Sequence, residues 1–126
     1  LHGGSDGSAV RNWKIVQYKK SMVTFLDKLP DGHMGFPGNL TVETTYKVAQ
    51  STIDIIIEAS TDKTTLCNFT NHSYFNLDGT KNIAYHQLMV ECDKVLPVDE
   101  NGIPISGPIF AKDLDRFRLQ NWSDIK

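Results

Sequence analysis

Residues 68–79 place one histidine, His72, among side chains that form hydrogen bonds, with apolar side chains interleaved between them. The run reads Asn-Phe-Thr-Asn-His-Ser-Tyr-Phe-Asn-Leu-Asp-Gly. Small-molecule sites typically combine an apolar lining with a few polar groups at defined positions. The number of polar side chains in this run suits a polyhydroxylated ligand. An imidazole titrates near neutral pH, so His72 has the chemistry for proton transfer. The alternative is a histidine that is simply bonded inside a polar turn, and the residue types leave both interpretations open.

The other three histidines are weaker candidates. His2 precedes Gly3 and Gly4, which predicts a tight turn that brings a histidine and backbone close to a ligand, unless this segment is a flexible terminus. His33 lies in a glycine-rich loop and is expected to be solvated, while His86 is expected to be a packed or edge histidine. Because no histidine pair has helical i, i+4 spacing and no H-E-x-x-H motif occurs, we expect no metal site.

Composition favours an ordinary globular domain. The chain has 126 residues, which is long enough for one domain with a core. Its content of 40% hydrophobic and 22% charged residues is ordinary for a globular protein. A formal net charge of −2 gives no basic footprint for nucleic acid, and no apolar run is long enough to span a bilayer. Cys67 and Cys92 form no C-x-x-C pair, so we expect both to pack as small apolar residues in a reducing, cytoplasmic setting.

The hydrophobic pattern has a period of two, which is typical of half-buried strands. Residues 40–48 alternate between an apolar and a polar face, and residues 52–59 repeat the alternation. Only three residues connect these segments, which predicts a hairpin. The predicted inward residues are Leu40, Val42, Thr44, Tyr46 and Val48 of the first strand and Ile53, Ile55, Ile57 and Ala59 of the second.

Further strands are predicted elsewhere, and together they indicate an all-β sandwich. Residues 13–18 and 22–27 form a second expected pair, and two more strands are expected at 65–70 and 85–91. Glycine and proline predict irregular backbone at 29–38 and 97–108, the latter with a turn at 99–102. A short helix is possible from residue 112 onward. No linker divides the chain, so residues 1–126 are expected to form a single domain.

At these residues the chain resembles the aldose 1-epimerase (galactose mutarotase) family. Residues 1–4, Leu-His-Gly-Gly, followed by Trp13, resemble one family motif, and residues 30–40 resemble its glycine-rich loop, with His33 and Met34 replacing an acidic pair. Residues 70–77, Thr-Asn-His-Ser-Tyr-Phe-Asn-Leu, resemble its most specific motif. Residues 96–104 resemble a further segment with a Pro-Val-Asp-Glu core, and residues 115–118 a degraded version of the element that follows.

The resemblance implies a galactose mutarotase-like β-sandwich that interconverts the α and β anomers of free hexoses without metal or cofactor. It implies that His72 is the general acid and a sugar ligand, that His2 binds and polarises the sugar, and that Ser73 and Tyr74 line the sugar pocket. Family members are considerably longer, so we expect this chain to be a central part of the domain. Their glutamate base has no counterpart here, which predicts little catalysis by the chain alone. The alternative is a non-catalytic carbohydrate-binding or sensing module with the same fold.

Overall fold

The structure is a computed structural model that describes residues 2–110, 123 and 124. Within these residues the regular structure consists of eight strands and one 3-10 turn, which confirms the all-β class. The chain divides into two compact units, Leu1–Ser73 and Tyr74–Lys126.

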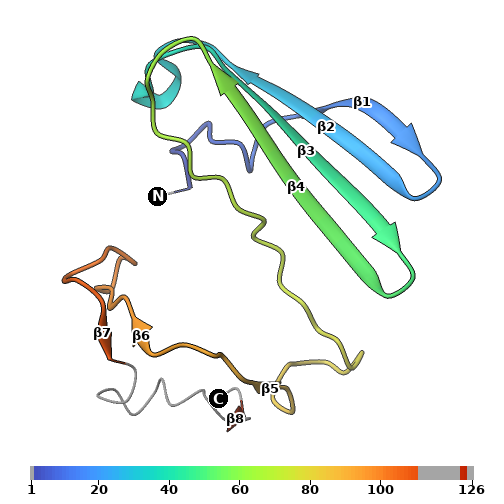
Figure 1. The fold of residues 1–126 in the computed structure, drawn as a ribbon, viewed down its shortest axis with the longest axis vertical. Helices are drawn as coiled ribbons and strands as arrows, with labels where there is room; N and C mark the ends of the chain where they lie inside the picture. Colours follow the sequence, from blue (N-terminus) through green and yellow to red (C-terminus); the bar gives the residue numbers. More distant parts are fainter. Residues whose placement is uncertain (1, 111–122, 125–126) are drawn as a thin grey trace. The chain divides into compact units, whose positions relative to one another are not determined.

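The first unit is built on a four-stranded antiparallel sheet in which every strand pairs with its neighbour in sequence (Figure 1). Both predicted strand pairs are confirmed, with slightly different ends. The strands are β1 (Lys14–Lys19), β2 (Met22–Leu29), β3 (Leu40–Ala49) and β4 (Thr52–Thr61). The register of β1 against β2 shifts between Ile15 and Gln17, which is a bulge at the outer strand.

The alternation predicted for β3 and β4 places their apolar side chains on one side of the sheet, here called the apolar face. Directly paired residues point to the same side, and Val42 pairs with Ala59 of β4 and Asp27 of β2. Val42 is fully buried, while Leu40 and Thr44 are 8% exposed. Burial fades toward the β3–β4 turn, where Val48 and Ile53 are more than half exposed. The covered part of the apolar face is therefore the part nearest Leu40.

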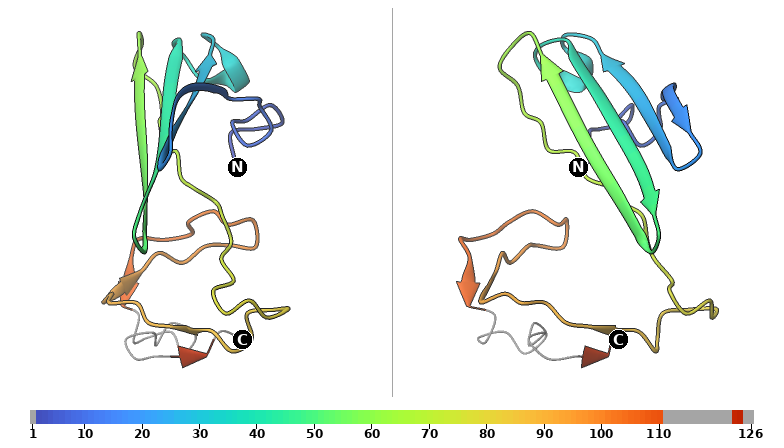
Figure 2. Two further views of the ribbon diagram at one scale, coloured as in Figure 1. Left: turned by 90° about the vertical axis from the view of Figure 1, so that its right-hand side faces the viewer. Right: turned by 45° about the vertical axis from the view of Figure 1, so that its right-hand side comes forward.

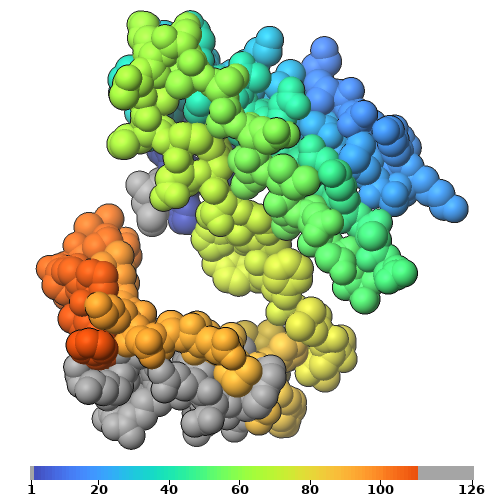
Figure 3. All heavy atoms as spheres, viewed as in Figure 1, coloured from blue at the N-terminus to red at the C-terminus, as the bar shows by residue number. Residues whose placement is uncertain are grey.

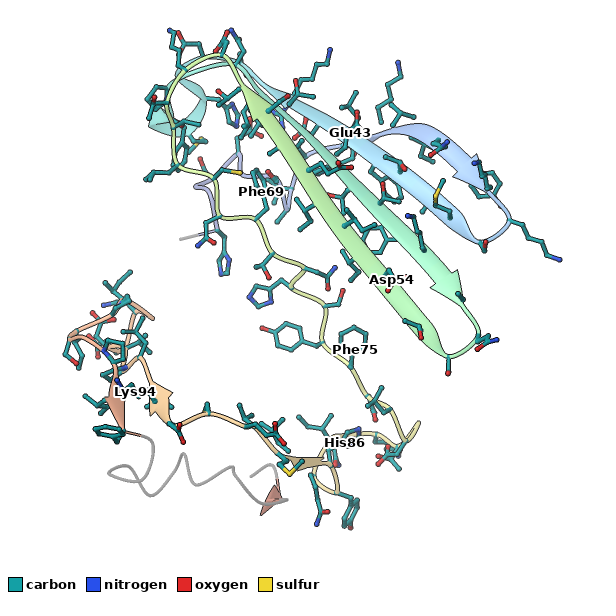
Figure 4. The ribbon with its side chains drawn as sticks, in the orientation of Figure 1. Glu43, Asp54, Phe69, Phe75, His86 and Lys94 are labelled. Atoms are coloured by element: carbon teal, nitrogen blue, oxygen red, sulfur yellow. The ribbon has the colours of Figure 1, made fainter. Side chains whose placement is uncertain are left out.

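The opposite face of the sheet is polar, as its sequence predicts. Glu43 of β3 and Asp54 of β4, both labelled in Figure 4, are exposed there. The hydroxyl groups of Thr24 and Thr45 lie 2.9 Å apart and form a cross-strand hydrogen bond. Figure 3 shows the side chains of the four strands from this side. Ile56, which interrupts the polar pattern, is 38% exposed.

The N-terminal residues lie over one side of this sheet, as the left view of Figure 2 shows with the sheet nearly edge-on. The loop between β2 and β3 carries the 3-10 turn η1 (His33–Gly35). Gly32, Met34, Gly35 and Gly38 all have positive φ there, which explains the glycine-rich sequence and confirms the predicted irregular loop. The second chain segment on this side, residues 64–73, contains no helix or strand.

The second unit contains two short strand pairs, β5 (Gln87–Leu88) with β8 (Ser123–Asp124) and β6 (Lys94–Val95) with β7 (Ile109–Phe110). The predicted turn at 99–102 is confirmed. Asp99 accepts hydrogen bonds at its Oδ1 from the backbone N–H groups of Asn101 and Ile103. The possible helix after residue 112 lies almost entirely outside the described residues.

Of the two remaining strand predictions, one was wrong and one was confirmed only in part. Residues 65–70 are extended but pair with no strand in the described residues, because alternation selects an extended backbone and does not provide a partner. Of residues 85–91 only β5 is a strand. The prediction for Cys67 was also wrong, since its side chain is exposed; Cys92 is half-buried, and the two form no disulfide. None of the described helical segments has the length and apolar character needed to cross a membrane.

Candidate functional site

Two histidines from opposite ends of the first unit meet at one place. The ring centroids of His2 and His72 lie 5.2 Å apart with an angle of 64° between the ring planes. His2 belongs to the N-terminal turns and His72 to the extended segment after β4. Both side chains are exposed, so a small polar molecule can reach either ring. The sequence predicted a ligand-facing role for each histidine, and the fold brings the two together.

The two histidines border a cavity of about 1010 Å³ that opens over the apolar face of the sheet. This is at the upper end of the roughly 300–1,000 Å³ that is usual for small-molecule sites, and a monosaccharide needs only a fraction of it. The cavity is lined mainly by apolar and aromatic side chains, among them Trp13, Phe25, Phe36, Leu66 and Phe69, the last labelled in Figure 4. Among the described residues its lining contains no Asp or Glu.

The backbone around His2 is a series of tight turns. His2, Gly3 and Gly4 all have positive φ, a conformation that glycine adopts without strain and a histidine rarely does. The N–H of Gly7 donates to the carbonyl of Gly4, and the N–H of Val10 donates to the carbonyl of Gly7. The tight turn predicted at residues 2–4 is confirmed, while its role toward a ligand stays a prediction.

An ion pair fixes this N-terminal segment to the sheet. Arg11 donates from Nε to Asp27 Oδ2 at 2.7 Å, and its other nitrogens reach Asp27 Oδ1, Asp6 and the carbonyl of Lys28. Asp27 lies on the apolar face beside Val42 and is only 6% exposed, so it needs a charged partner. The hydrogen bond from Arg11 to Asp27 is the main cause that raises the pKa of the guanidinium.

His33 makes a second link to the N-terminal segment, and the prediction of a solvated side chain was wrong. Its Nε2 lies 2.8 Å from the carbonyl oxygen of Asp6, and its side chain is 14% exposed. Gly32 before η1 and Gly35 at its end both have positive φ and allow a sharp bend on either side of His33. The sequence could not reveal this contact, because its two partners are 27 positions apart.

The loop that carries His33 is held to the end of β4 by a polar cluster. The ammonium group of Lys63 donates to Asp31. The side chain and the backbone N–H of Asn39 both donate to Asp62, each at 2.7 Å. The hydrogen bond from Lys63 is the main cause that lowers the pKa of Asp31, and the Asn39 amide is the main cause that lowers the pKa of Asp62. The Asp31 hydrogen bond likewise raises the pKa of Lys63.

The remaining predicted site residues follow His72. Ser73 is exposed, and its backbone N–H donates to Asn71 Oδ1 at 3.0 Å. Tyr74 begins the second unit and is 89% exposed. The structure therefore places His2 and His72 together and Ser73 beside them, while the roles of Ser73 and Tyr74 stay predictions. His86, in the second unit, is packed as predicted and accepts a hydrogen bond at Nε2 from the Leu77 N–H.

Several residues around the site were not selected from the sequence. The sequence predicts that Tyr46 points inward from its strand but not that it lines the site, and it predicts only that Asp27 lies in a strand. The sequence does contain one indication for Asp27. It falls on the same side of the strand as Val23 and Phe25, and an acidic side chain on an apolar face needs a partner. The described residues contain no group of three or more His, Cys, Asp or Glu side chains that could hold a metal ion.

Comparison with known proteins identifies the class to which this fold and site belong. The family model for aldose 1-epimerase matches residues 1–120. Aldose 1-epimerase of Escherichia coli is 43% identical over 109 residues, which cover 85% of this chain and 32% of the relative. Galactose mutarotase of Mus musculus is 42% identical over 106 residues, covering 82% and 31%.

Solved structures similar to this chain belong to the same class of proteins. A GalM/aldose epimerase homologue from C. elegans matches with a TM-score of 0.90 and 30% identity over 98% of this chain and 38% of its own. Galactose 1-epimerase from Lactobacillus acidophilus matches with a TM-score of 0.84 and 29% identity, covering 99% and 38%. The chain belongs to the aldose 1-epimerase family, and its fold is that of the galactose mutarotase-like proteins. It spans about a third of the length of the curated relatives that it matches.

Proposed function

We propose that the protein represented by this chain interconverts the α and β anomers of a free hexose such as galactose or glucose. The observation that carries the proposal is the side-by-side placement of the His2 and His72 rings at the border of an apolar cavity. The names of the relatives support a sugar substrate. We further propose that residues 1–126 belong to a single sandwich domain.

In the proposed reaction His72 donates a proton to the ring oxygen of the sugar while a base removes the proton of the C1 hydroxyl. The bond between C1 and the ring oxygen breaks, and C1 becomes an aldehyde carbon. Rotation about the C1–C2 bond turns the other face of the aldehyde to the ring hydroxyl, and the reverse proton transfers close the ring. His2 binds and polarises the sugar, and Ser73 and Tyr74 supply further hydrogen bonds from the pocket wall.

The base is the missing half of this proton relay. The lining of the cavity in the described residues contains no carboxylate, and the chain corresponds to only a third of its relatives. We therefore expect the 126-residue chain alone to bind sugar weakly and to accelerate mutarotation little. In this proposal the chain contributes the general acid, His72, and the sugar-binding residue His2, but not the base. It therefore supplies only one half of the proton relay.

The test replaces the matching third of the E. coli relative with this chain and follows the optical rotation of freshly dissolved α-D-galactose. The chimera should accelerate mutarotation, and His72→Ala should lower the rate by about 10²–10⁴-fold, as is usual for one positioned acid. Tyr18→Phe, an exposed β1 substitution outside the cavity lining, is the matched control. A folded His72→Ala chimera that is as fast as its parent would refute the role of His72. Sugar binding without faster anomerisation would favour the non-catalytic module.

A further inference from the structure

The hydroxyl group of Tyr46 lies close to the segment that carries His72. Tyr46 belongs to β3, and its half-buried side chain lines the same cavity as His2 and His72. Its hydroxyl oxygen is 3.1 Å from Nδ2 of Asn71, which directly precedes His72 and also lines the cavity. The sheet therefore contributes a polar group of its own beside the proposed acid.

The direction of the hydrogen bond between Tyr46 and Asn71 is fixed by a second contact of Asn71. Its Oδ1 accepts from the Ser73 backbone N–H at 3.0 Å. Because a backbone N–H can only donate, the oxygen of the amide must face Ser73 and its NH2 group must face Tyr46. Asn71 is thus the donor, and the hydroxyl oxygen of Tyr46 is the acceptor.

The proton of the Tyr46 hydroxyl is left for a further partner. A phenolic hydroxyl can donate one hydrogen bond in addition to those that it accepts. Within residues 2–110, 123 and 124, the hydroxyl makes no hydrogen bond besides the one from Asn71. A half-buried donor in the lining of a cavity is satisfied by water or by an oxygen atom of a bound ligand.

The sheet holds this donor in a defined place. The backbone of Tyr46 pairs with Val23 of β2 and Ile55 of β4. Its ring packs edge-on against Phe25, with a centroid distance of 6.0 Å and an angle of 81° between the planes. A donor that is already held in place loses little conformational freedom when a ligand binds, which favours binding.

We infer that Tyr46 is a further sugar-binding residue, which donates its hydroxyl proton to a hydroxyl oxygen at C2, C3, C4 or C6 of the hexose. This inference rests on the function proposed above and names one more contact of the same site. Tyr46 takes no part in the proton relay. Because it binds a part of the sugar that does not react, it should affect the affinity for the sugar more than the turnover.

The first test compares Tyr46→Phe with its parent in the chimera described above. The substitution keeps the ring that packs on Phe25 and removes only the hydroxyl. The KM for D-galactose should rise about 2–10-fold, as expected for the loss of one neutral hydrogen bond, while kcat changes little. Tyr18→Phe, which removes an exposed hydroxyl outside the cavity lining, should leave both constants unchanged. An unchanged KM in Tyr46→Phe would overturn the inference.

A series of deoxygenated sugars separates a direct contact from an indirect effect through Asn71. The 2-deoxy, 3-deoxy, 4-deoxy and 6-deoxy forms of D-galactose each lack one hydroxyl group. For the sugar that lacks the bound hydroxyl, Tyr46→Phe should no longer change KM, because both changes remove the same hydrogen bond. For the other three sugars the increase should persist. An equal increase for all four sugars would mean that Tyr46 acts only through Asn71, and the inference would be wrong.

The proposed function can fail separately from this inference. If His72→Ala slows the chimera but none of the four sugars cancels the effect of Tyr46→Phe, the proposed acid stands and the sugar contact of Tyr46 is refuted. If one sugar cancels that effect but His72→Ala is as fast as its parent, Tyr46 binds the sugar and the role of His72 is refuted.

Discussion

Gly7 lies against the backbone of His2 so closely that a Cβ atom on Gly7 would stand 2.3 Å from the His2 carbonyl oxygen. The carbonyl carbon of Gly3 and the carbonyl oxygen of Gly4 would lie within 3.1 and 3.2 Å of the same Cβ. All three neighbours are backbone atoms and cannot move aside as the end of a side chain can. Gly7 is therefore required by the space that its neighbours leave, rather than by its backbone angles.

Gly7→Ala should displace His2 from His72 and destabilise the N-terminal turns, with a cost of about 1–3 kcal/mol, typical of overpacking. Loss of the His2–His72 nuclear Overhauser contact and a lower midpoint of urea unfolding are the expected results. Gly107→Ala is the matched control, because a Cβ there meets no atom within 4 Å. An alanine at position 7 with both measurements unchanged would contradict the described packing.

Asp27 offers a test of the link between the N-terminal segment and the sheet. Asp27→Ala should lower the midpoint of urea unfolding more than Asp54→Ala does, because Asp27 is buried and bound to Arg11, whereas Asp54 is exposed. Arg11→Lys in the parent chain should retain only part of the stability that Arg11 provides, since an ammonium group cannot reproduce the forked contact of a guanidinium. Equal effects at positions 27 and 54 would show that the Arg11–Asp27 contact contributes nothing.

The polar cluster around Asp31 and Asp62 should make stability sensitive to acid. Hydrogen bonds from Lys63 and Asn39 lower the pKa of each carboxyl below its ordinary value of 3.8 in the folded chain. Their stabilising contribution is thus present above pH 3.8 and is lost as the pH falls through the lowered folded pKa. Asp62→Asn should lower the thermal midpoint at pH 6, and the difference from the parent chain should shrink as the pH approaches 3.

The control for this pH series is Asp54→Asn, a substitution on the exposed polar face. Its difference from the parent chain should be small and nearly constant between pH 6 and pH 3. Circular dichroism of the sheet provides the measurement for all three proteins. A difference for Asp62→Asn that widens toward low pH would have the wrong sign and would exclude this cluster as a source of acid sensitivity.

Trp13 provides an optical signal for sugar binding. Its ring lines the cavity, and its indole N–H donates to the Ser8 carbonyl at 2.9 Å. In a Trp122→Phe background, where Trp13 is the remaining tryptophan, D-galactose should produce a saturable change in emission. His2→Ala should weaken this response several-fold through the loss of a proposed sugar ligand. A response that is linear in galactose, and equal in His2→Ala, would indicate solvent effects instead of binding.

The sheet was predictable because its information is local. Alternation in β3 and β4 predicted which side chains are inward, and the observed register pairs Val42 with Ala59 and Thr44 with Ile57 as that pattern requires. The same rule failed for residues 65–70, because pairing depends on a partner strand that the local pattern does not specify. Local sequence therefore predicted the extended backbone of both segments but the sheet of only one.

The site was predictable only in part, because its contacts join distant segments. The residue types indicate His2, His72, Ser73 and Tyr74 as candidate site residues, and their roles toward a sugar follow only from the family resemblance. The contacts of Arg11 with Asp27 and of Asn71 with Tyr46 could not be predicted, since each joins residues more than a dozen positions apart. His33 shows the same limit, because its carbonyl partner at Asp6 is contributed by the N-terminal turns.

The order of the strands has a consequence for how the site assembles during folding. Each strand of the sheet pairs with the one before it in sequence, so the meander can form from local contacts early. His2 and His72 lie at its two extremities and can meet only after the meander exists. The same ends are expected to open first in hydrogen exchange, so the His2–His72 pair can separate while the β-meander persists.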